Sequence, residues 1–132
     1  RMTAVRAASD TAALPPGFLE ELGRRVGRRS WTLDPDRVAL HAAEQWGTWR
    51  GRAPLLLRPA NTQEVATLLE LCHAHLIPVV PQGGLTSLCA GGLADRPCLL
   101  LSMERMRGIG ELDEAGRTGG QWSVSAAVCN SR

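Results

Sequence analysis

Apolar residues in the middle of the chain follow a strand, helix, strand pattern. The run 53–59 is a short apolar segment bounded by prolines, which predicts a strand that ends at Pro59. Asn61 then predicts the N-cap of a helix, with Glu64 placed to complete a capping box. The apolar run 77–80 predicts a second strand directly after this helix. We therefore expect a βαβ unit on a parallel sheet.

Helical spacing also predicts which side chains are buried. The central helix is expected to bury one face, made of Val65, Leu68, Leu69, Cys72 and Leu76.

An earlier helix is predicted to begin near Phe18, because acids lie early in this segment and bases lie late, as the helix dipole favours. The basic cluster at 24–29 is interpreted as a solvated helix end, and only distantly as an anion site. The segment 31–49 fits either a helical turn or extended chain, with a turn at Asp34 and Pro35.

Further strands are expected after the βαβ unit. The run 98–102 predicts a third strand, preceded by a turn at 95–97, and Leu112 predicts the middle of a fourth. The segment 123–128 is compatible with one more strand near the end of the chain.

The stretch 81–92, with the sequence PQGGLTSLCAGG, follows the second predicted strand. Because glycine has no Cβ, the backbone at Gly83 and Gly84 can take positive φ and approach a ligand closely. Thr86 and Ser87 add hydroxyl donors beside exposed amide groups. Such a loop lies at the carboxyl end of a strand, where parallel sheets bind ligands. The stretch predicts a pyrophosphate site, although paired glycines also occur in ordinary turns.

Composition argues against two classes of protein, those that span a membrane and those that bind nucleic acid. The 132 residues suffice for one domain, with 44% hydrophobic and 21% charged residues, as in ordinary globular proteins. No apolar run approaches the ~20 residues that cross a bilayer. The net charge of +2, the single Phe and the lack of Tyr give little support for a nucleic-acid surface. We expect a chain that neither spans a membrane nor binds nucleic acid.

The cysteines and histidines give no metal-site pattern. No C-x-x-C pair occurs, which favours reduced core thiols over a disulfide framework or a zinc site. His73 and His75 point in different directions on a helix, so solvent-exposed histidines are expected there. The four cysteines are Cys72, Cys89, Cys98 and Cys129.

The segment 55–113 resembles the first half of the FAD-binding domain of the vanillyl-alcohol oxidase and para-cresol methylhydroxylase (PCMH) type. The sequences LLLRPANTQEV, IPVVPQGGLTSLCAGG and LLLSMERMRGIGELD carry this resemblance. Within that superfamily the chain is most similar to the D-2-hydroxy-acid dehydrogenase branch, with the glycolate oxidase D subunit and D-2-hydroxyglutarate dehydrogenase. The resemblance implies an α+β fold with a βαβ core: a small, mostly parallel sheet with flanking helices.

In such proteins the glycine-rich loop binds the FAD pyrophosphate through backbone amides and hydroxyl groups. The resemblance implies no catalytic residue and no metal ligand in this chain. By motif position, the cofactor-binding role passes to Gln82, Gly83, Gly84, Leu85, Thr86 and Ser87, with Gly91 and Gly92 forming the return of the loop.

The chain departs from the family pattern in three places. Leu85 stands where relatives have Gly, Asn or a flavin-linked His, which implies non-covalent FAD and strain if φ is positive there. Ala90 stands where relatives have the first glycine of a pair. The segment 123–128 matches the family's next strand only if Gly119 and Gly120 are an insertion; otherwise it is unrelated sequence from a truncated or misread gene.

The resemblance implies that the parent protein is an FAD-dependent dehydrogenase of a small D-2-hydroxy acid, with its electron acceptor left open. The chain is expected to supply the pyrophosphate contacts and to be inactive alone. The expected organisation is a helical or irregular segment 1–50, a partial FAD-binding subdomain 51–128 and a tail 129–132. The expected location is the cytoplasm, with the mitochondrion as the alternative.

Two other classes compete with this interpretation. A Rossmann-type NAD protein is disfavoured, because no G-x-G-x-x-G opens a helix. The second is a non-catalytic α/β remnant or interaction module without flavin. In such a module Trp46 and Trp49 would form an exposed patch. In a flavin-binding subdomain we expect both tryptophans to pack against the rest of the domain.

Overall fold

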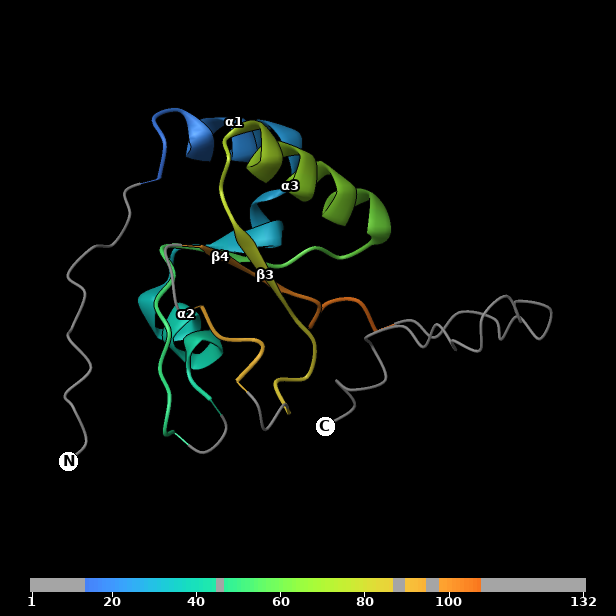
Figure 1. Cartoon of the computed structure of the whole chain (residues 1–132). Helices are drawn as coiled ribbons and strands as arrows, with labels where there is room; N and C mark the ends of the chain where they lie inside the picture. The colour runs from blue at the N-terminus through green and yellow to red at the C-terminus, as the bar shows by residue number, and fades with distance from the viewer. Residues whose placement is uncertain (1–13, 45–46, 87–89, 95–97, 108–132) are drawn as a thin grey trace, which may run out of the picture.

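The computed structural model describes residues 14–44, 47–86, 90–94 and 98–107 (Figure 1). The turn at 95–97, the strand around Leu112 and the segment 123–128 lie outside these ranges. The described elements are α1 (Phe18–Arg25), the 3₁₀ helix η1 (Arg28–Ser30), β1 (Trp31–Thr32), α2 (Pro35–Ala42), β2 (Leu56–Leu57), α3 (Thr62–Ala74), β3 (Val79–Gln82) and β4 (Leu99–Ser102).

One sheet with the strand order β1-β2-β4-β3 organises these elements. Strand β4 pairs in parallel with both neighbours, so that Leu100 lies opposite Leu56 on one side and Val80 on the other. Only β1, at the edge, is antiparallel. Strands β2 and β3 are joined through α3 but separated by β4, so the crossover spans one intervening strand. The expected small, mostly parallel sheet with flanking helices is confirmed.

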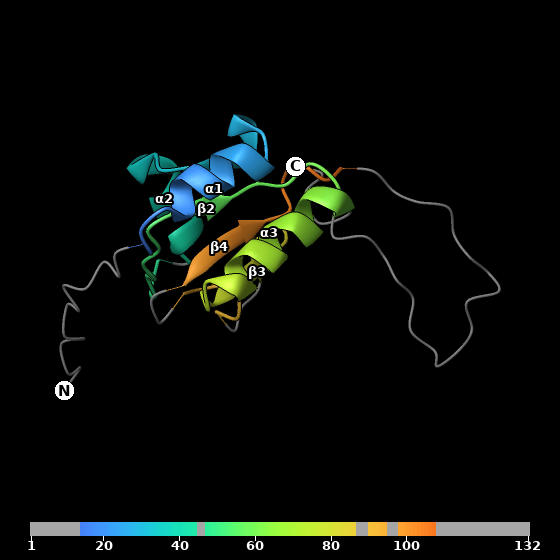
Figure 2. The same ribbon diagram turned by 90° about the horizontal axis from the view of Figure 1, so that it is seen from above.

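Helices cover both faces of the sheet, with α1 and α3 on one face and α2 on the other (Figures 1 and 2). Successive strand residues point to opposite faces, so a strand buried on both sides is apolar throughout. Leu56 and Leu100 pack with Val38 and Ala42 of α2. The side chains that face α1 and α3 are Leu55, Leu57, Leu99 and Leu101, which are also buried.

Helix α3 begins where the sequence predicts, because the Asn61 side chain accepts a hydrogen bond from the Glu64 amide at 2.9 Å. In a capping box the Glu64 carboxylate would accept from the amide of the N-cap residue, but here it has two other donors. The Glu64 carboxylate accepts from the Ala60 amide at 2.9 Å and from the Ser30 hydroxyl at 2.8 Å, which ties α3 to the segment before β1.

The face of α3 that is buried differs from the predicted one by a rotation about the helix axis. Leu68, Leu71 and Cys72 are buried, whereas Leu69 is 44% exposed. Leu76 lies past the end of the helix with φ 53° and is 85% exposed. The sheet therefore contacts a stripe centred between Leu68 and Leu71, and the assignment of Leu69 and Leu76 to the core face is wrong.

The structure resolves the uncertain segment before residue 50. Pro35–Ala42 is a helix, with Pro35 in its first turn and the Asp34 side chain accepting from the Asp36 amide. Trp31–Thr32 is a strand that the sequence analysis did not predict. Because α1, β1 and α2 pack on the same sheet as the later strands, residues on both sides of position 50 share one core. The division of the chain at residue 50 stays a prediction.

Two expectations about single side chains are wrong. Trp49 does not pack against the main body but is 59% exposed, because it follows a turn at Gly47 that projects from the Ala43–Arg50 bridge. His75 is half-buried, in contact with Glu21 at 3.0 Å and edge-on to the Phe18 ring.

The predictions for His73 and for two of the four cysteines agree with the structure, while Trp46 lies outside the described residues. His73 is exposed. Cys72 is a buried thiol, and burial raises its pKa to about 11. Cys98 is buried as well, while Cys89 and Cys129 lie outside the described residues. Within the described ranges, none of the helices has the length and hydrophobicity that a bilayer crossing needs.

Candidate cofactor site

The carboxyl ends of the three parallel strands lie at one edge of the sheet. Strand β3 ends at Gln82, two residues later than predicted, because Pro81 and Gln82 still pair with Leu101 and Ser102 of β4. The loop therefore leaves the sheet at Gly83. At this edge of a parallel sheet, backbone amides beyond the last strand pair are available to a ligand.

Gln82 connects the loop to the rest of the protein. Its side chain is buried, and Nε2 donates to the Gly92 carbonyl at 2.6 Å and to the His41 carbonyl at 2.7 Å. Its Oε1 lies 3.1 Å from Nδ1 of His41. Because the amide group is occupied by these contacts, Gln82 holds the two ends of the loop and α2 together.

Among the described residues of this loop, the left-handed backbone falls on two that are not glycine. Leu85 has φ 56° and Ala90 has φ 54°. Gly83, Gly91 and Gly92 do not have φ in the left-handed region. The strain expected at Leu85 is therefore present, whereas Gly83 does not take the positive φ that glycine allows. Both strained positions coincide with the departures from the family pattern at Leu85 and Ala90.

A cavity of about 280 Å³ lies within the loop. Within the described residues, the amide groups of Gly84, Leu85 and Thr86 donate no hydrogen bond to the backbone. A Cβ added at Gly83 would meet no protein atom within 4 Å. Unpaired amides around an open space suit a phosphate group. The cavity is lined by Ala43, Glu44, Pro81, Gln82, Gly83, Gly84, Leu85, Thr86, Ala90, Gly91, Gly92 and Leu93.

The structure thus brings together every predicted site residue that it describes, and Ser87 lies outside the described ranges. One acid, Glu44, is part of this lining. Its carboxylate accepts from the Trp49 amide at 3.3 Å, which holds the side chain in the 43–50 turn.

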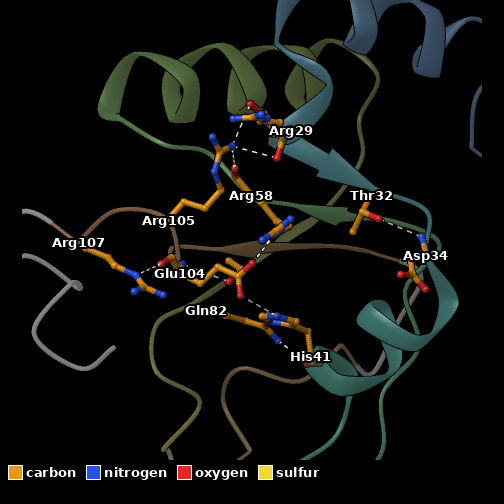
Figure 3. A network of polar contacts seen from close by, with 11 residues as sticks. Arg29, Thr32, Asp34, His41, Arg58, Gln82, Glu104, Arg105 and Arg107 are labelled. Atoms are coloured by element: carbon orange, nitrogen blue, oxygen red, sulfur yellow. Dashed lines mark hydrogen bonds and ion pairs between the residues drawn. The ribbon is translucent and has the colours of Figure 1, made fainter. Parts of the chain in front are cut away.

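A polar network extends from Gln82 across the ends of the strands (Figure 3). His41 Nε2 lies 3.3 Å from Glu104, and Glu104 also accepts from Arg58 Nε. Burial raises the pKa of Glu104, but the hydrogen bond and charge of Arg58 and the charges of His41 and Arg37 outweigh burial and hold the pKa below its ordinary value. Glu104 is therefore ionised at neutral pH and stabilises the arginine beside it.

This network was not predicted from the sequence. Arg58 directly follows β2, and Glu104 follows β4 by two residues. Polar residues directly after buried strands at the ligand-binding edge are the signal that would have found both. His41 lies on α2, which the sequence did not resolve as a helix, so no local pattern pointed to it.

A mixed sheet with a glycine-rich loop at its carboxyl edge is typical of nucleotide-binding proteins. The family model described as "FAD binding domain" matches residues 53–127. The chain therefore belongs to the FAD-binding domain family, and FAD is the cofactor of that family. The resemblance to this family that the sequence indicated is confirmed.

Curated relatives carry the names of D-2-hydroxy-acid enzymes. The mitochondrial D-2-hydroxyglutarate dehydrogenase of Arabidopsis thaliana is 32% identical over 89 residues, 67% of this chain and 16% of the relative. Glycolate oxidase subunit GlcD of Bacillus subtilis is 36% identical over 63 residues, 48% of this chain and 13% of the relative. The chain thus spans about a sixth of the length of the curated relatives it matches.

Two solved enzyme structures illustrate the same fold. Alkyldihydroxyacetonephosphate synthase superposes with a TM-score of 0.67 and 19% identity, covering 80% of this chain and 24% of that protein. p-Cresol methylhydroxylase with substrate bound gives a TM-score of 0.61 and 14% identity, covering 76% of this chain and 21% of that protein. At these identities the likeness concerns the fold alone, and it agrees with the PCMH-type sheet predicted from the sequence.

Proposed function

We propose that this chain holds the pyrophosphate of FAD, without a covalent bond, in a dehydrogenase of D-2-hydroxy acids. The observation that carries the proposal is the loop cavity of about 280 Å³, which is lined by Gly84, Leu85 and Thr86, whose amides donate no hydrogen bond to the backbone among the described residues. The names of the curated relatives support the substrate class. In the loop, Leu85 leaves no imidazole at the position where flavinylated relatives have histidine, which supports non-covalent binding.

Each loop residue has a distinct part in this proposal. The amides of Gly83 to Thr86 donate to phosphate oxygens, and the Thr86 hydroxyl adds one more donor, with Ser87 beside it. Gly91 and Gly92 form the return of the loop, where a Cβ on Gly92 would lie at an ordinary contact distance of 3.6 Å from the Leu85 side chain. Gln82 acts indirectly, by holding Gly92 and His41 in place.

The bound flavin would accept a hydride from the α-carbon of the hydroxy acid. None of the residues proposed to contact it here is an acid or base, so the chain positions the cofactor and leaves proton transfer to other parts of the parent protein. With purified chain and added FAD, we expect no dye reduction with D-lactate, glycolate or D-2-hydroxyglutarate. Turnover above background would contradict this division of roles.

The location of the protein also stays a proposal. The relatives from Arabidopsis thaliana, Schizosaccharomyces pombe and Kluyveromyces lactis are mitochondrial by name, which supports the mitochondrial alternative over the cytoplasm.

The test of the cofactor site is a titration of FAD with the chain and its loop variants, followed by flavin fluorescence anisotropy. Gly83→Val adds bulk where no protein atom lies within 4 Å and where φ is not left-handed, so it should leave the fold intact and block the ligand. Thr86→Ala should weaken binding roughly tenfold or more, because a hydrogen bond to a charged group is worth roughly 1.5–3 kcal/mol.

The matched control is Gly27→Val, because Gly27 has extended backbone at φ −65° and also has no neighbour within 4 Å. It should bind FAD like the parent chain. If Gly83→Val binds FAD as tightly as Gly27→Val does, the loop does not contain the pyrophosphate site.

A further inference from the structure

A second cavity, of about 370 Å³, lies beside the amino-terminal strand and shares no lining residue with the loop cavity. Its lining includes Trp31 and Thr32, and it contains no acidic side chain among the residues that the structure describes. We call it the arginine cleft, after the residues that dominate its lining: Arg28, Arg29, Arg37, Arg58 and Arg105.

Two of these arginines are fixed in place by the fold. Arg105 donates through one terminal nitrogen to the carbonyls of Arg29 at 2.9 Å and Arg58 at 2.8 Å (Figure 3). Arg58 donates through Nε to Glu104. These contacts hold two guanidinium groups at the ends of β2 and β4, so an anion that binds them meets a prepared site.

The other three arginines lie on the exposed side of the cleft. Arg28 stacks over the Trp31 ring at 3.9 Å from its centroid. In the described part of the chain, the guanidinium groups of Arg29 and Arg37 make no hydrogen bond or ion pair. Trp31 Nε1 is also buried without a hydrogen-bond partner there. Donors without acceptors therefore gather around this cavity.

The charge balance of the cleft favours an anion. Glu104 faces Arg58 directly. Glu64 lies near Arg105, because both contact the Ser30 hydroxyl. Glu104 also feels the charge of Arg37, so Arg58 and Arg37 share one carboxylate, and Glu64 lies beside Arg105. Two carboxylates therefore face five arginines, which leaves an excess of positive charge around the cleft. Like charges held close together repel, and a bound anion of two or three charges would relieve this repulsion.

We propose that the arginine cleft is a binding site for a small, multiply charged oxyanion that bears phosphate or carboxylate groups. The planar guanidinium fork matches both kinds of group in pairs of parallel hydrogen bonds. The site is distinct from the FAD loop, since the two cavities share no lining residue. It assigns a ligand to the basic cluster at 28–29, which the sequence suggested to be a solvated helix end.

The test is a calorimetric titration of the full chain with pyrophosphate and, separately, with citrate. Gly83→Val is used as the background, because it removes the loop as a second pyrophosphate site. We expect the Gly83→Val chain to bind at least one of the two anions at a single site. The affinity for that anion should fall as sodium chloride is added. The anion that binds more tightly identifies the ligand as a phosphate or a carboxylate.

Arg28→Ala with Arg37→Ala, added to this background, should weaken binding at least tenfold, since each change removes charged hydrogen-bond donors. Arg24→Ala with Arg50→Ala removes the same charge from exposed positions outside the cleft and should change affinity less than twofold. Because all four side chains are exposed, both variants should keep the parent's circular dichroism, and the single variant Arg37→Gln repeats the test with a smaller change.

The proposal is overturned if neither anion binds, or if the cleft variant and the control variant lose affinity equally. It is also overturned if Gly83→Val alone removes all pyrophosphate and citrate binding, because the loop would then be the anion site.

Discussion

Replacing Gln82 by alanine tests whether this side chain holds the cofactor loop. The change removes the 2.6 Å bond to the Gly92 carbonyl, the 2.7 Å bond to the His41 carbonyl and the contact with His41 Nδ1. A net hydrogen bond contributes about 1 kcal/mol, and a buried acceptor left without a donor costs about 1–3 kcal/mol. With two carbonyls affected, the free energy of unfolding should fall by about 2–4 kcal/mol.

The assay is urea unfolding of the parent chain and of Gln82→Ala, with Gln63→Ala as the control. Gln63 is an exposed residue of α3, and in the described structure its side chain makes no hydrogen bond, so this variant should stay within about 0.5 kcal/mol of the parent. Amide exchange at Leu93 should also become faster in Gln82→Ala, because its bond to the Ala90 carbonyl lies in the released loop. Equal unfolding midpoints for the Gln82 and Gln63 variants would refute the reasoning.

Three further predictions concern backbone strain and ionisation. Ala90→Gly should raise the free energy of unfolding by about 0.5–1 kcal/mol, because glycine relieves the strain of a left-handed φ. The control Ala66→Gly, inside α3, should lower it by about 1 kcal/mol. Both changes are measured by urea unfolding, and a loss of stability in both variants would show that Ala90 is not strained. Glu104 has a lowered pKa, so its ionised form stabilises the fold above the unfolded pKa, and this stability is lost as the pH falls through the folded pKa. Glu104→Gln should therefore be less stable than the parent at pH 7, with a difference that shrinks below about pH 4 in unfolding curves; a constant difference would count against it. Burial raises the pKa of Cys72 to about 11, so the thiol is protonated and covered in the folded chain at pH 8. In a variant that keeps Cys72 as its sole cysteine, a thiol reagent should therefore react no faster than the chain unfolds.

Much of the fold could be predicted from the sequence because local rules and tertiary packing agree there. A run of leucines between two prolines marks β2, and Asn61 caps α3 where the spacing predicts. The strand Trp31–Thr32 could not be predicted, because two residues carry no periodicity and only pairing with Leu56 and Leu57 makes them a strand. The buried face of α3 is set by the sheet beneath it, which the helical spacing alone does not locate.

The candidate site was predictable in its residues but not in its internal contacts. Glycines and hydroxyl residues mark the loop in the sequence, and the structure places them around one cavity. The bonds of Gln82 to His41 and Gly92 depend on how α2 packs against the sheet, which no local pattern encodes. The arginine cleft has the same origin, since its arginines come from segments far apart in the sequence.

The central claim is that the loop amides bind the pyrophosphate of FAD. The most direct measurement is a nuclear magnetic resonance titration of the ¹⁵N-labelled chain with FAD, which detects weak binding residue by residue. The account predicts that the amide signals of Gly83, Gly84, Leu85 and Thr86 shift most, while those of the exposed side of α3 stay unchanged. Shifts confined to residues outside the loop, or none in these four amides at saturating FAD, would contradict it.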